Sequence, residues 1–380
     1  MDSHNLGRFA EYLDANSLVA ALVSDPATLT WLTGYAPPIE AGPNPFEGGP
    51  ALAWIHAGSL VLIVSDAEAP AARQVGIPVR EYLGYTIDEP VEAFRHQADV
   101  LESVLAEHRP MRGTIGIEPD TLPARMLTQL EHALPEAARE SIEPDVAVLR
   151  ATKNAEEIAR IRGALELCDL AHARLRERLQ PGMTELDLWN QVRAGIEGAA
   201  GSRIPALVDV VAGSRAAEIG GPPSARVIRP GDPVILDVVL RRDGYWGDTA
   251  GTWFAGPPSP EMARAHRVVR DALHLAVEAV RPGVQARELD RILREAVTRF
   301  GAGTAYPHHS GHGIGTTYHD RPRVVPYETM RLEPGMVITL EPGIYLSGVG
   351  GVRLEDVVLV TSDGCELLTG HLLADEVVSA

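Results

Sequence analysis

The sequence of 380 residues has little cysteine, no apolar stretch of membrane-spanning length and few basic side chains. Its two cysteines, Cys168 and Cys365, stand far apart and in no metal-type spacing, so we do not expect a disulfide framework. No apolar stretch approaches the roughly 18 residues that span a membrane. Residues Met1–Asn5 lack the basic and apolar regions of a signal peptide. We therefore expect a cytoplasmic protein.

Basic residues are outnumbered by acidic ones, 34 against 52, which gives a net charge of −18. A surface of this sign repels phosphates, so nucleic acids and anionic membranes are not expected partners. The remaining composition, 45% hydrophobic and 23% charged, is that of an ordinary soluble globular protein. A chain of this length is typical of two domains with a core each.

The pattern of apolar residues places a domain boundary near residue 150. In residues 1–150, short β-type runs alternate with helical stretches, which indicates a small α/β domain. The runs are Leu18–Val23, Ala51–Val64 and Thr114–Ile117, and the helical stretches are Val91–Glu107 and Pro123–Leu134. Loop Tyr35–Pro50 is rich in Pro and Gly and is expected to be irregular, and Ser141–Arg150 is expected to be an extended connection.

Residues 151–380 are predicted to form a second domain of α+β halves that resemble each other. Helices are expected at Lys153–Leu179, Met183–Ala199, Pro260–Val280 and Ala286–Phe300. Each pair of helices is followed by the same sequence motif, which consists of Pro-Gly, a short apolar run and an acid. The motif occupies residues 230–237 and residues 334–341. The fold class is therefore α/β in the broad sense, with a duplicated second domain.

Each copy of this motif ends in an acid, and a second acid follows it downstream. Asp237 is followed by Asp248, and Glu341 is followed by Glu355. Acids at the ends of apolar strands are costly to bury unless they are paired or bind cations. A single acid would be read as a solvated charge at a strand end, but two pairs in Val/Ile/Leu surroundings indicate a polar site built from two halves.

The first pair of acids flanks a hairpin signal, Arg241-Arg242-Asp243-Gly244. If the turn is centred between Arg242 and Asp243, Asp237 and Asp248 lie directly opposite each other. If it is centred on Asp243-Gly244, they are diagonal neighbours on the same face. Either register places the two carboxylates within about 4.5–8 Å, close enough to share a cation. The second pair flanks a Gly-rich connection at residues 347–351, which gives the same result.

Four of the thirteen histidines fall within twelve residues: His308, His309, His312 and His319. A dense His cluster in a Gly-rich segment indicates a site, whereas a lone His is usually structural. Four carboxylates and one imidazole carry four negative charges, which two divalent cations neutralise, and Mn²⁺, Co²⁺, Fe²⁺ or Zn²⁺ suit these ligands. Two metals about 3.5–4 Å apart can share a hydroxide nucleophile and polarise a carbonyl. The predicted chemistry is metal-assisted hydrolysis.

Four sequence segments in this order resemble the prolidase/aminopeptidase P branch of the pita-bread metallopeptidases. They are Gly-Asp-Pro-Val-Ile-Leu-Asp with Asp-Gly-Tyr-Trp-Gly-Asp, His-Ser-Gly-His-Gly-Ile-Gly with His319-Asp320, Leu-Glu-Pro-Gly-Met-Val-Ile-Thr-Leu-Glu-Pro-Gly-Ile-Tyr, and Gly-Val-Arg-Leu-Glu-Asp. The resemblance covers roughly residues 145–378. Residues 1–150 fit the creatinase-type N-terminal domain of that family in size and character. The resemblance implies a dinuclear metallopeptidase that cleaves small peptides before proline, as a dipeptidase or aminopeptidase, and a homodimer.

The resemblance also implies roles for individual residues. The metal ligands would be Asp237, Asp248, His312, Glu341 and Glu355. Asp248 and Glu355 would bridge two divalent ions, with Mn²⁺ expected, and Glu341 would also act as the proton shuttle. His308 and His319 match non-ligand histidines that contact the substrate and the tetrahedral intermediate. Arg353 matches an arginine at the substrate end of the site, or else it holds an acidic neighbour in place.

The sequence departs from the family pattern at three positions near these residues. Gly220 stands where a substrate-contacting His is usual, and losing such a donor typically costs about 10²–10³ in rate. Gly251 replaces an Arg, and Val239 replaces a Gly. We expect these changes to leave the metal ligands intact and to alter the pocket around them. His309 could replace the absent donor, but as the neighbour of His308 it is expected to point elsewhere.

Three hypotheses therefore remain open from the sequence. The first is a metal-dependent peptidase that cuts before proline. The second is a hydrolase of another small C–N substrate on the same scaffold, which the changes at Gly220 and Gly251 favour. The third is a binding module without activity, against which the retained ligands argue.

Overall fold

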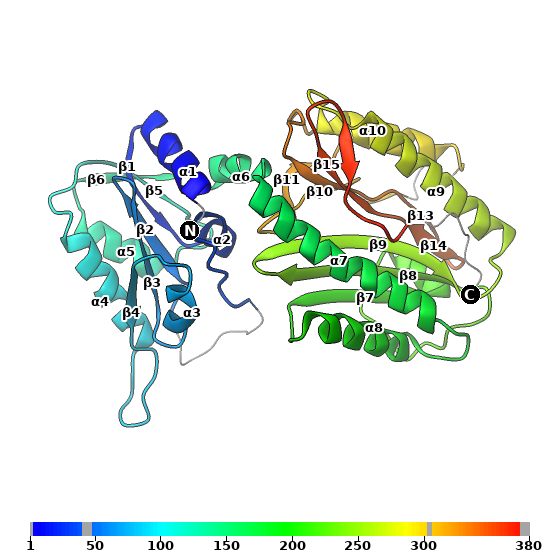
Figure 1. Cartoon of the computed structure of the whole chain (residues 1–380), viewed down its shortest axis with the longest axis horizontal. Helices are drawn as coiled ribbons and strands as arrows, with labels where there is room; N and C mark the ends of the chain where they lie inside the picture. The colour runs from blue at the N-terminus through cyan, green and yellow to red at the C-terminus, as the bar shows by residue number, and fades with distance from the viewer. Residues whose placement is uncertain (1–2, 40–47, 302–305, 373–380) are drawn as a thin grey trace. The chain divides into compact units, whose positions relative to one another are not determined.

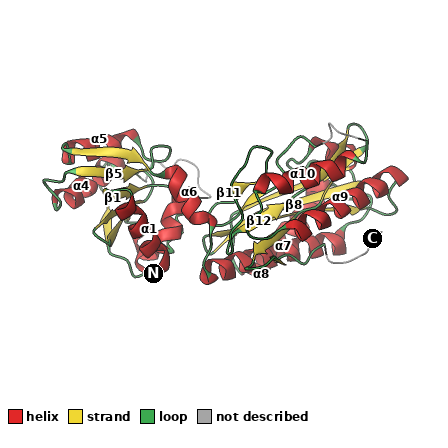
Figure 2. Ribbon diagram, turned by 90° about the horizontal axis from the view of Figure 1, so that it is seen from above, coloured by secondary structure: helices red, strands yellow, loops and turns green. Residues whose placement is uncertain are grey.

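The computed structural model describes residues 3–39, 48–301 and 306–372, and the chain divides into two compact units, Met1–Leu149 and Arg150–Ala380. Helices lie beside strands in both units (Figures 1 and 2). Within the described residues, the first unit holds a six-stranded sheet of order β4-β3-β2-β1-β5-β6. Its strands are β1 (Leu18–Val23), β2 (Leu52–His56), β3 (Ser59–Ser65), β4 (Val79–Tyr82), β5 (Gly113–Ile117) and β6 (Ala137–Ser141). Its helices are α1 (Ser3–Ala15), α2 (Pro26–Thr33), α3 (Ala69–Arg73), α4 (Ala93–Ala106), α5 (Ala124–Ala133) and α6 (Glu143–Ala151).

The central strand β1 is buried on both faces, as its unbroken apolar sequence predicts. Ala21 and Val23 belong to one hydrophobic cluster, and Ala20 and Leu22 belong to another on the opposite face. The strand pairs antiparallel with β2 and parallel with β5. The first unit is therefore an α/β layer structure with a mixed sheet, in agreement with the class expected from the sequence.

Two expectations for the first unit were wrong in detail. Ala51–Val64 is not one run but the hairpin β2–β3, because Ala57 and Gly58 both take positive φ values, +48° and +74°, and turn the chain. The expected extended connection Ser141–Arg150 is wrong from Glu143 on, since α6 occupies Glu143–Ala151. A proline suits the first turn of a helix, and Glu143 and Asp145 complement its dipole there. Of the Pro/Gly-rich loop, residues 40–47 lie outside the described residues.

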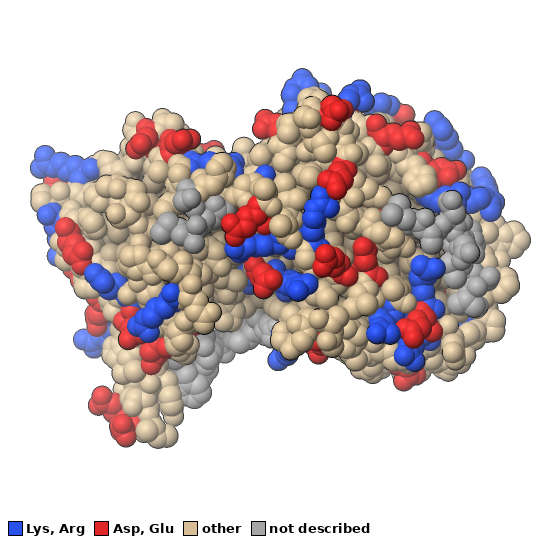
Figure 3. All heavy atoms as spheres, viewed as in Figure 1, with Lys and Arg blue, Asp and Glu red and all other residues tan. Residues whose placement is uncertain are grey.

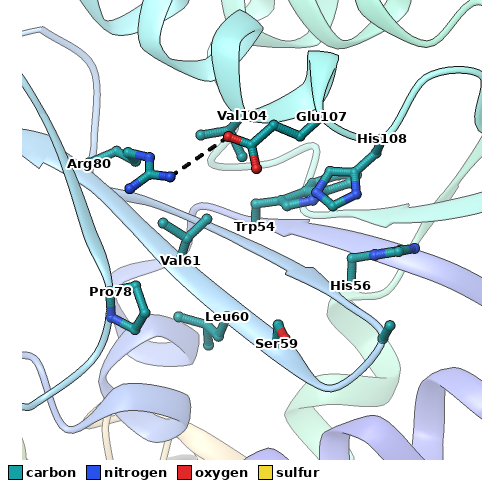
Figure 4. Close-up of a pocket in the computed structure, with 11 residues that line it drawn as sticks. Trp54, His56, Ser59, Leu60, Val61, Pro78, Arg80, Val104, Glu107 and His108 are labelled. Carbon is teal, nitrogen blue, oxygen red and sulfur yellow. Dashed lines mark ion pairs between the residues drawn. The ribbon is translucent and has the colours of Figure 1, made fainter.

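The first unit also contains a cavity of about 270 Å³ between β2, β3 and α4 (Figure 4). The rings of His56 and His108 lie 4.5 Å apart on its wall, and the ring of Trp54 lies 5.8 Å from that of His108. Arg80 and Glu107 form an ion pair of 3.7 Å beside it. None of the residues predicted to be functional lines this cavity.

The second unit has two parts, each with a pair of helices followed by strands. The helices are α7 (Ala155–Arg178), α8 (Glu185–Ala200), α9 (Pro260–Ala279) and α10 (Ala286–Thr298), close to their predicted bounds. Thr184 is the N-cap of α8 and forms a capping box with Asp187. The first three strands, β7 (Ala206–Ala212), β8 (Pro233–Arg242) and β9 (Tyr245–Phe254), form one sheet in that order. Helix α7 packs on β8 and β9, and α8 packs on β7 (Figure 1).

The second part of this unit holds the remaining described strands. They are β10 (His312–Gly313), β11 (Asp320–Arg323), β12 (Val337–Leu340), β13 (Gly343–Leu346), β14 (Gly350–Arg353), β15 (Asp356–Val360) and β16 (Cys365–Leu367). Five of them form a sheet of order β11-β10-β12-β15-β16, and β13 pairs with β14. Helices α9 and α10 share a hydrophobic cluster with β12, β14 and β15. None of the described helices is long and apolar enough to cross a membrane.

The turn between β8 and β9 decides the register left open by the sequence. Arg242 pairs with Tyr245, so the turn is Asp243-Gly244, and both residues take positive φ values of +50° and +83°. Such a two-residue turn matches the twist of the strands. Asp248 lies opposite Val239, two residues along from Asp237, so the two acids are diagonal neighbours on one face.

The hairpin of β13 and β14 continues the pairing register of β12 and β15, and the other two acids lie between these two pairs of strands. Leu340 pairs with Asp356, and beyond them Gly343 pairs with Arg353, so both ladders are centred on Gly348. Glu341 and Glu355 therefore occupy matching positions between the two ladders. Charged side chains of both signs are interspersed over the face of the molecule in Figure 3.

Candidate metal centre

The structure brings together three residues from distant parts of the second unit. Ligand atoms of Asp248, His312 and Glu355 all lie within 4.8 Å of one another, and all three residues are buried. Asp248 comes from β9, His312 from the short strand β10, and Glu355 from the residue before β15. The group joins the two similar parts of the unit, as the repeated sequence motif predicted.

Glu341 and Asp237 border this group without belonging to it. Glu341 Oε1 lies 3.8 Å from His312 Nε2, and Asp248 Oδ2 lies 3.6 Å from the same nitrogen. Asp237 is the diagonal neighbour of Asp248, and its Oδ2 is paired with the guanidinium of Arg353. All five predicted ligands therefore lie around one point in the fold.

The hydrogen bonding of His312 prepares it as a ligand. Its Nδ1 lies 2.9 Å from the carbonyl oxygen of Gly313, which can only accept, so Nδ1 carries the proton. Burial lowers the pKa of His312 to about 4, so the ring is neutral. The lone pair is on Nε2, which faces the carboxylates. This is how a second group fixes the tautomer of a metal-binding histidine.

The pKa values of three of the carboxylates are shifted in the direction expected for a site that binds cations. Burial raises the pKa of Asp248 well above its usual range, and repulsion from Asp237 and Glu341 raises it further. Burial, together with repulsion from Asp248, has the same effect on the pKa of Glu355. The pKa of Asp237 is raised by burial, although Arg353 opposes the shift. Bound cations would offset the repulsion and the burial together.

Two carboxylate oxygens of this centre are buried without a hydrogen bond. Among the described residues, Asp237 Oδ1 and Glu355 Oε1 have no donor within reach. A buried polar atom that is left unpaired costs about 1–3 kcal/mol, and more if it is charged. Acceptor atoms in this condition are what a metal ion requires, so the residues present fit a divalent metal site of mainly oxygen donors.

His309 points into this site, contrary to the expectation that it points elsewhere. Its Nε2 lies 2.9 Å from Oε1 of Glu341, and its ring lies 5.4 Å from that of His312 and 5.3 Å from that of His319. Burial by itself raises the pKa of Glu341, but the hydrogen bond from His309 and the nearby imidazoles together lower it to about 2. Sequence reasoning counted this histidine in the cluster but took its direction from its neighbour His308.

His308 and Arg353 are linked through Tyr345, which sequence reasoning missed. His308 Nδ1 donates to the carbonyl of His309 at 2.7 Å, so its Nε2 accepts from the hydroxyl of Tyr345 at 2.8 Å. Arg353 donates to the same hydroxyl at 3.2 Å and also contacts Asp237. Arg353 is only 4% exposed, so its guanidinium is held inside the protein by these partners. The sequence signal for Tyr345 is that it ends the family-like segment Leu-Glu-Pro-Gly-Ile-Tyr that contains Glu341.

The remaining predicted residues are divided between the site and the α7 side of the sheet. His319 is exposed, and its ring lies 4.4 Å from that of His312. Gly220 lies beside Arg353, and a Cβ there would be 3.8 Å from its guanidinium. Gly251 faces away from the metal centre, because a Cβ there would meet the ring of His172 on α7 at 3.1 Å. The expectation that Gly251 alters the pocket was therefore wrong, since alternate residues of a strand point to opposite faces.

Comparison with known proteins agrees with this arrangement. The sequence model of metallopeptidase family M24 matches residues 159–362, and that of the Creatinase/Prolidase N-terminal domain matches residues 6–152. An Xaa-Pro dipeptidase of Lactobacillus helveticus is 30% identical over 370 residues, 96% of each chain. A probable dipeptidase of Mycobacterium bovis is 35% identical over 239 residues, 61% of this chain and 64% of that protein.

The structural comparison covers both units. The crystal structure of the prolidase from Pyrococcus horikoshii matches with a TM-score of 0.80 at 27% identity, over 96% of this chain and 98% of that one. The expected fold, a creatinase-type N-terminal domain followed by a pita-bread domain, is thereby confirmed. The resemblance expected from the motifs is confirmed as well, and with it the expectation of an enzyme rather than a binding module. The chain belongs to metallopeptidase family M24.

Proposed function

We propose that this protein is a peptidase that hydrolyses the bond before proline in small peptides, with two divalent metal ions held by Asp237, Asp248, His312, Glu341 and Glu355. The observation that supports this most is the buried group of Asp248, His312 and Glu355, with two carboxylate oxygens that lack hydrogen bonds. The relatives named as Xaa-Pro dipeptidase and prolidase support the same specificity.

The bound metals would supply Lewis acidity, which lowers the pKa of a water molecule and polarises the scissile carbonyl. Within the chain, Glu341 would take the proton of the attacking water as well as bind metal, because its carboxylate lies beside His312 and stays ionised. Glu341 would then pass this proton to the leaving nitrogen. His309 and His308 lie on either side of this carboxylate and restrict its orientation.

Substrate contacts would come from His308 and His319. His319 is exposed at the edge of the site, where it can donate to the substrate carbonyl. His308 is neutral, because burial lowers its pKa to about 4, and it can exchange its bond with Tyr345 for one to the substrate. Arg353 would hold Asp237 in position and, through Tyr345, orient His308.

The test is an assay of purified protein loaded with Mn²⁺ or Co²⁺ on Ala-Pro and on Ala-Pro-Ala, with Ala-Ala as the control. Cleavage of the first alone indicates a dipeptidase, and cleavage of the second indicates an aminopeptidase. Absence of turnover on both peptides at full metal occupancy contradicts the proposal. A hydrolase of another small C–N substrate is the second candidate, favoured by the absence of a side chain at Gly220 beside Asp209 and Arg353.

We further propose Mn²⁺ as the resident metal, a cytoplasmic location and a homodimer. The donor set of four carboxylates and one imidazole supports a hard divalent ion, and Co²⁺, Zn²⁺ and Fe²⁺ suit it as well. The low cysteine count supports the cytoplasm. The domain assignment, residues 1–150 and residues 151–380, is supported by the two compact units and the two family matches. Elemental analysis and light scattering test the metal and the dimer.

A further inference from the structure

A fifth carboxylate stands beside the metal centre. Asp209 on β7 pairs directly with Asp237 on β8, so both side chains project from the same face of the sheet. Like charges directly opposite each other destabilise a sheet. The carboxylate of Asp209 is partly buried, and its Oδ2 accepts a hydrogen bond of 2.7 Å from the backbone N–H of Gly221. Its Oδ1 has no hydrogen bond from any residue that the structure describes. The position is unfavourable for folding, which points to a role in binding.

Gly220 leaves a space in front of this carboxylate. A Cβ at residue 220 would lie 3.0 Å from Asp209 Oδ2 and 3.8 Å from the Arg353 guanidinium, with no third atom within 4 Å. The preceding residue, Ile219, has a φ of +80°, which is rare for a β-branched residue, and Arg353 binds its carbonyl. The turn is thus held in a strained conformation that keeps this space clear of protein.

Asp209 removes the excess positive charge that would otherwise repel a cation from the space. With two divalent ions bound, the four acidic ligands and Arg353 sum to a net charge of +1, and Asp209 brings the sum to zero. The Nη1 and Nη2 atoms of Arg353 are engaged by Asp237, Ile219 and Tyr345, whereas its Nε–H has no partner among the described residues. The acceptor next to residue 220 is the carboxylate of Asp209. A neutral donor such as the histidine expected at residue 220 would serve a carbonyl, whereas a carboxylate serves an ammonium or guanidinium group.

We propose that Asp209 and the space at Gly220 form a subsite for a positively charged group of the substrate, either the α-ammonium group or a basic side chain next to the scissile bond. This inference rests on the proposed peptidase function and specifies its substrate class. Asp209 is then a determinant of specificity that acts by direct contact with the substrate.

The test compares two pairs of substrates that differ by one positive charge. Lys-Pro and norleucine-Pro differ in the side chain, and Ala-Pro and N-acetyl-Ala-Pro differ at the α-amino group. For each pair we measure the kcat/KM of the cationic substrate divided by that of the neutral one. In Asp209→Asn we expect this ratio to fall at least about tenfold for one of the pairs, because one hydrogen bond to a charged group contributes about that much. The control is Glu218→Gln, a nearby carboxylate whose side chain is 64% exposed, which should leave both ratios unchanged. If Asp209→Asn leaves both ratios at the wild-type value, the inference is overturned.

A second variant and a second measurement separate this inference from the proposed function. Asp209→Asn/Gly220→His removes the carboxylate and fills the space, and we expect it to lose the preference for the cation completely. Calorimetry of the Mn²⁺-loaded protein with L-lysine and L-norleucine needs no turnover. If no peptide is cleaved but lysine binds at least about tenfold more tightly in a way that depends on Asp209, the proposed function fails and the cation subsite stands. Equal affinities for the two amino acids, in a protein that does cleave Xaa-Pro peptides without a charge preference, overturn the subsite alone.

Discussion

Replacing Asp248 by Asn should stabilise the metal-free protein while destroying its metal site. Asp248 is 4% exposed, and burial and neighbouring acids raise the pKa of its carboxyl well above the value near 3.9 of an unfolded chain. The folded metal-free state therefore binds more protons than the unfolded state, and it loses stability as the pH rises from about 4 through the folded pKa. The loss is at most about 1.4 kcal/mol per pH unit between the unfolded and the folded pKa. Asp248→Asn removes this term and also relieves repulsion on Glu355.

The assay is urea unfolding of EDTA-treated protein between pH 5 and pH 8, with and without Mn²⁺. We expect wild type to lose stability across this range, and Asp248→Asn to show a flatter profile and a higher free energy of unfolding at pH 7. Saturating Mn²⁺ should stabilise wild type much more than the variant. The matched control is Asp243→Asn in the exposed β8–β9 turn. A metal-free Asp248→Asn protein that is less stable than wild type at pH 7 would refute the electrostatic reasoning.

Three further predictions follow from the geometry. Removal of metal with EDTA should abolish peptide hydrolysis, and added Mn²⁺ or Co²⁺ should restore it together with about two ions per chain by elemental analysis. His309→Ala should lower kcat about tenfold or more, because the charged carboxylate of Glu341 loses the hydrogen bond that His309 donates. His309→Gln should retain most activity, because the Gln amide can donate in its place. Equal losses in the two variants would contradict this. Gly251→Ala should cost about 1–3 kcal/mol of stability by crowding His172, without a change in substrate preference in steady-state assays.

The sequence predicted the acid pairs because strand geometry has few alternatives. An acid at each end of a short hairpin can lie only opposite or diagonal to its partner, and both registers bring Asp237 and Asp248 together. Long amphipathic helices were also predictable, since α7 and α9 repeat their apolar residues over five turns or more. Helix α6 was missed because its nine residues give too short a pattern.

What the sequence did not predict depends on contacts between distant segments. The direction of His309 is set by its hydrogen bond to Glu341, 32 residues away, and no local pattern encodes it. The face on which Gly251 lies follows from the register of β9, yet its significance appears only with His172 of α7 behind it. Asp209 escaped notice because β7 was not predicted, so its pairing with Asp237 had no basis in the sequence alone.

The length of the two-residue turn Asp243-Gly244 determines which face of β9 carries the metal ligand. The turn begins six residues after Asp237 along β8, about 20 Å at the rise of a strand. One inserted residue in this turn would shift β9 by a single step, and would exchange the face that carries Asp248 with the one that packs on α7. Asp248 would then be buried against the apolar side of a helix, and Thr249 would face the metals. A change in the length of this turn would therefore remove a ligand without touching any ligand residue, whereas substitutions at Gly220 and Asp209 leave the ligand register intact.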